Sequence, residues 1–301
     1  MNLHRLDLFS LSLFNLIART GSISKGAELA GLAVGAASKR IADLEEAVFT
    51  KLFARHSRGV TLTAAGLAMQ RHAQLILGDV DHLAADLSNY ANGIIGVVRM
   101  WANTSAITQF LPCDLKAFAI DNPSIRVDLE EEDSSEVVLA TCDGRADFGI
   151  FADRTPISGL HVMNYRRDQL VLVVPSGHAL SGRRQVRFEE VIAYDIVSLP
   201  ARTSLAKRLQ AEADALGQSL KLRIQVRSFD AMCKMVAAGM GVAILPRDAV
   251  QPLVRAIDLR LITLNEDWAD RQLLIGMRDP SAVPRAARLL IEHLCESAKH
   301  K

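Results

Sequence analysis

The stretch that decides the fold is residues 33–46, Ala33-Val34-Gly35-Ala36-Ala37-Ser38-Lys39-Arg40-Ile41-Ala42-Asp43-Leu44-Glu45-Glu46. Apolar residues recur at spacings of four, three and four from Ala37 to Val48, which predicts a helix with one apolar stripe. On the opposite side Ser38, Lys39 and Arg40 present one hydroxyl and two cations. The pattern therefore predicts a slender helix that is packed on one face and basic on the other.

A shorter helical pattern, residues 24–30, precedes this helix, and the two meet at a tight turn around Gly31. Two helices joined in this way, the second built from small residues, are typical of a helix-turn-helix, because small side chains let the second helix enter a major groove. An ordinary helical hairpin with a solvated polar face fits this stretch equally well, since helix-turn-helix patterns are short.

The residues behind this helix favour nucleic-acid binding. Residues 55–59 form a basic turn, and Val60-Thr61-Leu62 alternates as a strand does. A basic hairpin directly after a candidate recognition helix is typical of a wing that contacts the DNA backbone. The cations of Arg55 and Arg58 are then predicted to contact phosphate, which contributes to affinity and not to sequence choice.

With these features together, residues 9–80 resemble the winged helix-turn-helix of the LysR-type transcriptional regulators. The residues that carry the resemblance are Phe14, Thr20-Gly21-Ser22, Ala27-Glu28, Ala36-Ala37-Ser38-Lys39, Leu44-Glu45, Leu52-Phe53, Arg55, Arg58, Val60, Leu62-Thr63 and Ala65-Gly66. The resemblance implies a DNA-binding domain over residues 1–62 that contacts DNA through a small set of side chains. The candidates are Ser22, Val34, Ser38, Lys39, Arg40, Arg55 and Arg58.

The sequence departs from that family where the recognition helix begins. The family usually has Ser-Gln-Pro there, and this chain has Ala33-Val34-Gly35, so the capping hydroxyl, a base-reading amide and the first-turn proline are missing. Ala30 replaces a usual Leu and Phe49 a usual Gly. These differences affect which bases are read and leave the predicted fold unchanged.

Length and charge agree with a DNA-binding head on a larger body. A chain of 301 residues is long enough for two or three domains. Residues 1–62 hold eight Lys and Arg against five Asp and Glu, a balance of +3, so the net charge of +1 leaves about −2 for the remainder. A basic head of this kind suits contact with a polyanion.

A long helix is predicted over residues 63–91, with Thr63 as its N-cap. Its apolar residues are spaced four and three apart over three heptads. They are Met69, Ala73, Ile76, Val80, Leu83, Leu87 and Tyr90. A narrow seam of this kind favours a partner helix over packing within its own domain, and Ile76, Val80, Leu83 and Leu87 are the candidate dimerisation residues. The resemblance implies a homodimer, in the family commonly a homotetramer, on an inverted-repeat operator.

From residue 92 onward, strand and helix patterns alternate, which predicts an α/β domain with mainly parallel sheets. The predicted strands are 96–102, 125–131, 147–151, 169–174, 194–199, 222–226, 242–245 and 273–277. The predicted helices are 104–120, 134–142, 204–216, 229–238 and 283–298.

Residues 91–301 resemble the effector domain of the same family, which is similar to type 2 periplasmic binding proteins. The residues that carry this resemblance are Leu111-Pro112, Asn122-Pro123, Gly144, Asp147, Gly149-Ile150, Val171, Val173, Pro175, Gly177-His178, Leu180, Val236, Gly239, Gly241-Val242 and Ile244-Leu245-Pro246. The resemblance implies an effector-binding domain over residues 92–301 with two lobes. Lobe I is predicted over about 92–162 and 268–301 and lobe II over about 163–267, with crossings near 162–168 and 265–271.

A ligand of this fold binds between the lobes, where strands end and helices begin. The candidate effector-binding residues are Asn103, Thr104, Ser105, Phe151, Arg202, Thr203 and Phe229. Hydroxyls and backbone N–H groups at a helix start favour an anion, and Arg202 can bind a carboxylate, so a small carboxylate is the predicted effector. Capping for the hydroxyl residues and core packing for Phe151 and Phe229 are the open alternatives.

Other classes of function are disfavoured. The sequence has no cofactor fingerprint, P-loop, G-x-S-x-G or H-E-x-x-H motif, so neither an enzyme nor a cofactor is predicted and no catalytic residue is assigned. The four cysteines are scattered and predicted to be buried structural residues, and no metal site is predicted. No apolar run is long enough for a membrane span and the N-terminus does not resemble a signal peptide, so a cytoplasmic protein is expected.

The sequence therefore predicts a transcriptional regulator that binds double-stranded DNA and a small-molecule effector. RNA polymerase is a further partner that the resemblance implies. The alternative is a solute-binding or interaction protein with weakened DNA affinity, which the departure at residues 33–35 keeps open, whereas Lys39, Arg40, Arg55 and Arg58 argue against it.

Overall fold

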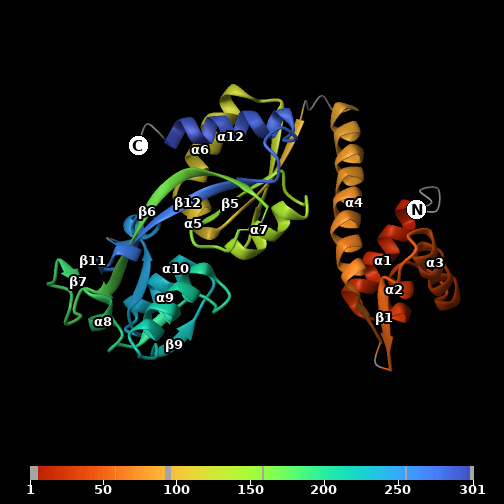
Figure 1. Cartoon of the computed structure of the whole chain (residues 1–301). Helices are drawn as coiled ribbons and strands as arrows, with labels where there is room; N and C mark the ends of the chain where they lie inside the picture. Colours follow the sequence, from red (N-terminus) through yellow and green to blue (C-terminus); the bar gives the residue numbers. More distant parts are fainter. Residues whose placement is uncertain (1–5, 58, 92–95, 158, 255, 299–301) are drawn as a thin grey trace. The chain divides into compact units, whose positions relative to one another are not determined.

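The computed structural model describes residues 6–57, 59–91, 96–157, 159–254 and 256–298 (Figure 1). They form two compact units, an N-terminal one that ends with a long helix and a C-terminal one that begins with a strand. The elements of the N-terminal unit are α1 (Leu8–Thr20), α2 (Ile23–Leu29), α3 (Val34–Ala47), β1 (Phe53–His56), β2 (Gly59–Leu62) and α4 (Ala64–Ala91). The predicted winged helix-turn-helix followed by a long helix is confirmed.

Side-chain caps determine where the helices of the N-terminal unit begin. Asp7 caps α1 and Ser22 caps α2, each accepting a backbone hydrogen bond from the first turn. Thr63 caps α4, as the sequence predicts, because its hydroxyl accepts a hydrogen bond from the backbone N–H of Gly66 at 3.0 Å. Gly21 ends α1 with a φ of 63°, a left-handed conformation that glycine adopts without strain.

The apolar stripe of α3 forms the centre of the head. Ala37, Ile41 and Leu44 are buried in one cluster with Phe14 of α1 and Phe53 of β1, whose ring centroids lie 4.9 Å apart. Full burial of a side chain such as Leu or Ile contributes about 1.5–3 kcal/mol. The stripe therefore fixes α3 against α1 and the β-hairpin, so that its other face points outward.

The C-terminal unit has two lobes, each with its own apolar core. The first elements belong to lobe I: β3 (Gly96–Ala102), α5 (Thr104–Gln109), α6 (Leu111–Asp121), β4 (Ile125–Glu131), α7 (Ser134–Cys142) and β5 (Phe148–Ala152). After β6 (His161–Pro175) follow β7 (Gln185–Val186), α8 (Phe188–Val191), β8 (Ile196–Ser198), α9 (Ser204–Ala215), β9 (Leu222–Gln225), α10 (Phe229–Ala237), β10 (Ala243–Pro246), α11 (Arg247–Val254) and β11 (Leu259–Leu264). The chain then returns to lobe I through η2 (Asp267–Ala269), β12 (Asp270–Met277) and α12 (Arg285–Ser297).

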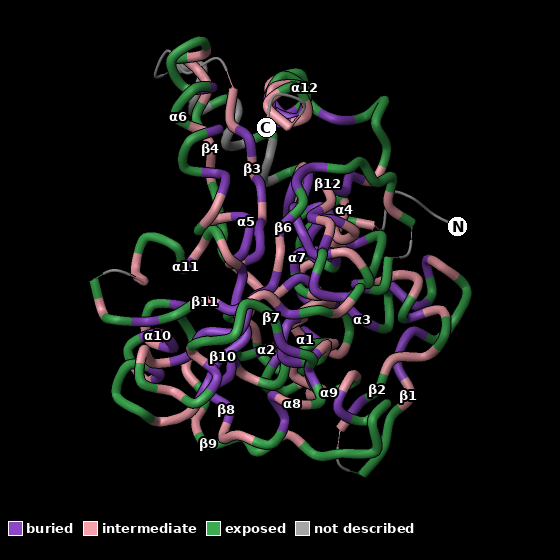
Figure 2. The backbone as a smooth tube through the Cα atoms, turned by 90° about the vertical axis from the view of Figure 1, so that its left-hand side faces the viewer, coloured by how far each residue is buried: buried purple, intermediate pink, exposed green. Residues whose placement is uncertain are grey.

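One long strand, β6, joins the lobes. Residues 161–169 of β6 pair antiparallel with β12, whereas residues 170–175 pair antiparallel with β10 and β11. The resulting sheet has the order β4-β3-β5-β12-β6-β11-β7, with β10 also on β6. Residues 170–174 and all of β5 are buried (purple in Figure 2), as expected for strands at the centre of a domain.

Several features of this domain differ from the prediction. The expectation of mainly parallel sheets is wrong: β3 is parallel to β4 and β5, but β6 and β12 run in opposite directions between the lobes and pair antiparallel. The helix predicted over 104–120 is two helices, α5 and α6, divided at Phe110. The prediction also missed residues 161–168 of β6 and the whole of β7, α8, α11 and β11; α11 contains Pro252, and proline inside a helix argues against one.

Candidate functional site

The outward face of α3 is the first candidate site. Val34 and Lys39 are exposed and Ser38 is half-buried, on the side opposite the buried stripe. The N-cap residue Ala33 makes no side-chain hydrogen bond, so the backbone N–H groups of the first turn lack a side-chain acceptor. Gly35 has open space where a Cβ would be, so a larger residue fits there. The start of α3 is thus exposed and carries unbound donors, an arrangement that suits a helix entering a groove.

Two predicted DNA-contacting residues have partners within the head. The Arg40 guanidinium lies 3.1 Å from the Asp7 carboxylate and 5.0 Å from the centroid of the Phe9 ring. Burial alone would raise the pKa of Asp7, but hydrogen bonds from Ser10 and the charge of Arg40 lower it. The Ser22 hydroxyl is the cap of α2. Arg40 and Ser22 therefore have structural roles in the free protein.

The predicted wing is a two-stranded antiparallel hairpin in which Phe53 pairs with Leu62 and Arg55 with Val60. Arg55 is exposed, whereas Arg58 lies outside the described residues. Glu45 joins this hairpin to α3: its buried carboxylate accepts hydrogen bonds from the backbone N–H groups of Leu52, at 2.9 Å, and Phe53, at 3.2 Å. The wing is therefore held at a fixed place relative to α3.

The predicted seam of α4 is exposed in the single chain. Ile76, Val80, Leu83 and Leu87 retain between 36% and 62% of their accessible surface, although they are large and apolar. Ala73, one helical turn earlier, is buried. A row of exposed apolar side chains at helical spacing is a surface that a partner helix can cover.

The interlobe cleft is the second candidate site, and it lies within the C-terminal unit. Asn103 caps α5 and donates a hydrogen bond to the Ser134 hydroxyl at 3.0 Å. Ser134, at the start of α7, donates in turn to Ser204 at the start of α9 in lobe II, at 3.3 Å. Three helix starts from two lobes thus meet at one chain of hydrogen bonds.

Most of the predicted effector residues lie around this meeting point. Asn103, Thr104, Ser105, Thr203 and Phe229 line one cavity of about 20 Å³, room for about one water molecule. The Thr104 hydroxyl donates to the Glu131 carboxylate at 2.6 Å, and Thr203 caps α9. The structure brings these five residues together around one small cavity between the lobes.

The other two predicted effector residues differ from this group. Arg202 is ion-paired with Asp133 across the lobes, with Nε 2.8 Å from the carboxylate oxygen. Phe151 is fully buried with Val137 and Val138 under α7 and does not line the cavity, so the core-packing alternative describes its position. The sequence made Phe151 a candidate for effector binding because it ends a predicted strand, but β5 is buried along its whole length.

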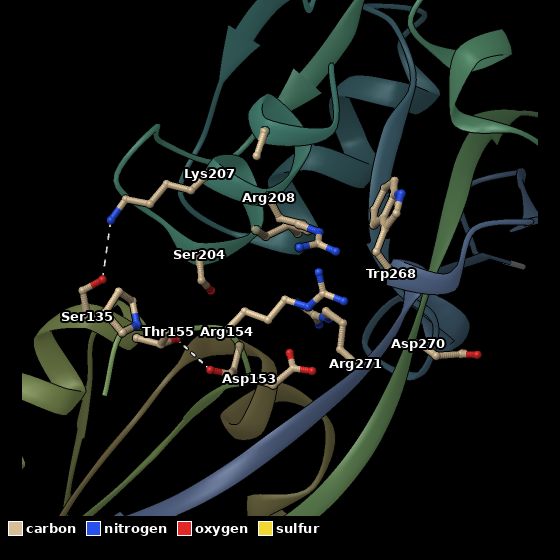
Figure 3. Close-up of a pocket in the computed structure, with 14 residues that line it drawn as sticks. Ser135, Asp153, Arg154, Thr155, Ser204, Lys207, Arg208, Trp268, Asp270 and Arg271 are labelled. Atoms are coloured by element: carbon tan, nitrogen blue, oxygen red, sulfur yellow. Dashed lines mark hydrogen bonds between the residues drawn. The ribbon is translucent and has the colours of Figure 1, made fainter. Parts of the chain in front are cut away.

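Sequence reasoning missed a buried ion pair at the crossing between the lobes. Arg271 of β12 binds Asp168 of β6 through two nitrogens, with Nε 2.7 Å from Oδ1, and it also donates to the Ser105 hydroxyl at 3.2 Å. Gln109 of α5 donates to the same Asp168 carboxylate at 3.1 Å. Both residues fall at the predicted crossings between the lobes (Arg271 is labelled in Figure 3), but their polar neighbours, Arg166, Arg167 and Gln169 on one strand and Asp270 and Gln272 on the other, give no local signal that they are buried.

Comparison with known proteins identifies the family. Residues 8–67 match the model of the bacterial regulatory helix-turn-helix protein, lysR family, and residues 91–299 match the LysR substrate binding domain. The chain belongs to the LysR family. It is a DNA-binding transcriptional regulator with an effector-binding domain, and its relatives are regulators and not enzymes.

The LysR-family chain is similar to known regulators over nearly its whole length. An HTH-type transcriptional regulator of Mycobacterium bovis is 28% identical over 302 residues, which cover 95% of this chain and 96% of that protein. CbnR in complex with its target DNA has a similar fold, with a TM-score of 0.65, 21% identity and 97% and 100% of the two chains covered. The effector-binding domain of QuiR in complex with shikimate has a TM-score of 0.61 and 14% identity, with 68% and 98% covered.

Other features of this LysR-family chain concern metals, membranes and thiols. The described residues contain no group of three or more His, Cys, Asp and Glu that could hold a metal ion, and among them no helix is long and apolar enough to cross a membrane. The prediction of buried cysteines is correct for Cys233 and wrong for Cys113, which is exposed. Burial, with the nearby charge of Asp230, raises the pKa of the Cys233 thiol to about 11.

Proposed function

We propose that this regulator binds an inverted-repeat operator as a homodimer or a homotetramer and responds to a small carboxylate in the interlobe cleft. The observation that carries the DNA part is the exposed face of α3, where Ser38 and Lys39 follow an open first turn. A recognition helix contacts base edges through its N-terminal residues. Val34, Ser38 and Lys39 contact bases, and Arg55 and Arg58 of the wing contact phosphate.

The operator proposal rests on the α4 seam. The apolar row from Ile76 to Leu87 is exposed in one chain, and a second copy of α4 covers it in a dimer. Two heads related by a twofold axis then meet two half-sites of opposite orientation. The solved complex of CbnR with its target DNA supports this use of the fold.

The proposal is tested by fluorescence anisotropy of the full chain on its own upstream intergenic DNA and on a non-cognate duplex, at two salt concentrations. Replacing Arg55 by Ala is expected to weaken binding about equally on all sequences and to flatten the salt slope by roughly one unit, because one phosphate contact is lost. Lys116→Ala, an exposed cation of α6 in the effector-binding domain, is the matched control. An unchanged slope in the Arg55 variant would exclude its phosphate contact.

The effector proposal rests on the polar groups of the cleft. Thr104 and Ser105 are the first residues of α5, and both line the small cavity together with Arg271, whose guanidinium donates a hydrogen bond to the Ser105 hydroxyl. The cavity has room for about one water molecule, so a carboxylate binds only when the lobes separate, and it then meets hydroxyl donors and a cation together. The QuiR domain solved with shikimate supports a small organic molecule as the ligand of this fold.

The effector is sought by thermal shift of the full chain against a panel of small carboxylates. For a carboxylate that raises the melting temperature, Thr104→Val is expected to weaken binding by roughly tenfold or more, the loss of one charge-assisted hydrogen bond. The substitution keeps the shape of the side chain. If the variant binds the carboxylate as tightly as the parent, the Thr104 hydroxyl does not contact it.

A further inference from the structure

The first turn of α3 and its N-cap consist of small apolar residues. Residues 33–36, Ala-Val-Gly-Ala, are all exposed at the surface of the head (Figure 1), and their side chains carry no polar atom. Val34 is the largest of them, and 47% of its accessible surface is exposed. A recognition helix contacts base edges through its N-terminal residues, so this helix presents methyl groups at the place where bases are read.

The packing of the head does not require a glycine in this turn. A Cβ added to Gly35 meets no atom within 4 Å, and Gly35 is not among the glycines with a positive φ. Glycine inside a helix lowers its stability relative to alanine, so Gly35 is unfavourable for the free head. A missing side chain is useful where another surface comes close to the helix backbone, and the floor of a major groove is such a surface.

The polar residues of α3 leave the first turn to apolar contacts. Arg40 is held within the head, because its guanidinium lies 3.1 Å from the Asp7 carboxylate and donates to the Ser10 hydroxyl at 3.1 Å. Lys39 is exposed and carries only donors, which suit the acceptors on the edge of guanine. Helical side chains lean toward the N-terminus, so Val34 projects beyond the start of the helix, ahead of Lys39. The base pair beside the first turn is therefore left to Val34.

Thymine is the base whose edge in the major groove carries a methyl group, and apolar side chains recognise it by contact with that methyl. We propose that Val34 reads one thymine in each half-site through van der Waals contact with the C5 methyl group. A glutamine, which the family usually has at this position, pairs instead with adenine through two hydrogen bonds. The inference rests on the proposed base contact by α3 and names the chemical group on the base that is read.

The test begins with an operator selected by the full chain from a pool of random-sequence duplexes, so that no position in a genome has to be known. Each thymine of the selected half-site is replaced by uracil in turn, to find the one that Val34 contacts. Fluorescence anisotropy then compares four base pairs at that position: T·A, U·A, C·G and 5-methylcytosine·G. Uracil differs from thymine, and cytosine from 5-methylcytosine, only by the C5 methyl group.

Loss of the methyl group from one half-site is expected to weaken binding by about fourfold, the value of one buried methyl, and loss from both half-sites by about sixteenfold. The duplex with 5-methylcytosine is expected to bind more tightly than the one with cytosine by a similar factor, because the methyl group is read and not the hydrogen-bonding pattern. The salt slope should stay the same for all four duplexes, since no phosphate contact changes.

Val34→Ala is expected to bring the T·A and U·A duplexes to nearly equal affinity. The ratio of the two affinities does not depend on the fraction of folded protein, so a less stable variant still gives the test. In a new selection, Val34→Gln is expected to enrich adenine where the parent enriches thymine. Val162→Ala, which changes a valine of β6 that is 45% exposed in the effector-binding domain, is the matched control and should keep the ratio of the parent.

Equal binding of the T·A and U·A duplexes by the parent, at every thymine of the half-site, would overturn the inference. So would selected sites without a thymine common to the half-sites, or a Val34→Ala variant that keeps the ratio of the parent. Each of these results leaves the proposed operator binding intact, because the selection has then yielded a specific sequence. Failure of the proposed base contacts is distinguishable, since the selection then enriches no sequence, and it overturns both.

Discussion

Replacing Glu45 by Ala is expected to destabilise the head more than any change on its outer surface. The Glu45 carboxylate is buried, and it accepts hydrogen bonds from Leu52 N, Phe53 N and, at 2.7 Å, Lys51 Nζ. Its removal leaves two buried N–H groups without an acceptor, at a cost of about 1–3 kcal/mol each. Removing the carboxylate also removes the cost of burying it, so we expect the free energy of unfolding of the head to fall by roughly 3 kcal/mol in total.

Calorimetry of the full chain is the assay, because the transition of the head and that of the effector-binding domain are followed together. For a domain of 60–100 residues, 1 kcal/mol shifts the melting temperature by about 4–8 °C, so the melting temperature of the head should fall by roughly 12–24 °C. Asp43→Ala, an exposed change on the same helix, should shift it by little. If Glu45→Ala lowers the melting temperature of the head by less than about 2 °C, the reasoning is refuted, because even one unsatisfied donor should lower it by more than that.

The same carboxylate makes the stability of the head depend on pH. Burial alone would raise the pKa of Glu45, but the hydrogen bonds from Lys51, Leu52 and Phe53 together lower it below its ordinary value of 4.5. A carboxylate whose pKa is lowered by folding stabilises the protein above the unfolded value, and the contribution is lost as the pH falls through the folded value. The difference between the parent and Glu45→Gln should therefore be largest at neutral pH and shrink below about pH 4.

Two further substitutions test the stability of the head and the oligomeric state of the chain. Phe49→Gly is expected to raise the stability of the head by about 1 kcal/mol, because Phe49 has a φ of 56° and is 78% exposed, so that backbone strain is relieved with little loss of packing. A urea titration measures the change, and a lower unfolding midpoint for the variant would contradict the expectation. Leu83→Glu in the exposed seam of α4 is expected to convert the oligomer to monomers in light scattering, whereas Asp79→Ala, off the seam, should not.

The organisation of the chain could be predicted because it follows from local patterns. The stripe of α3, the cap at Thr63 and the strands β3 and β4 have the predicted bounds, since each is specified by spacing or by residues near in sequence. The direction of the strands at the crossing could not be read from residues 162–175. Whether a strand pairs parallel or antiparallel depends on where the chain returns, and β12 returns about a hundred residues later.

The residues of the candidate sites also differ in whether local sequence or distant contacts determine their positions. Asn103, Thr104 and Ser105 were predictable because a strand followed by a capped helix marks the edge of a sheet. The ion pair of Arg271 and Asp168 was not, because it depends on β12 returning beside β6 about a hundred residues later. Arg40 shows the converse: its position on the helix suggests DNA contact, yet the free head pairs it with Asp7.

The buried pair of Arg271 and Asp168 gives the cleft a physical connection to the crossing strands. The Ser105 hydroxyl, at the start of α5, accepts a hydrogen bond from the Arg271 guanidinium, so an anion that binds at Ser105 would share Arg271 with Asp168. A ligand changes the arrangement of two lobes only by binding one arrangement better than the other. Because Arg271 lies on β12 and Asp168 on β6, this ion pair ties the start of α5 to the two strands that join the lobes.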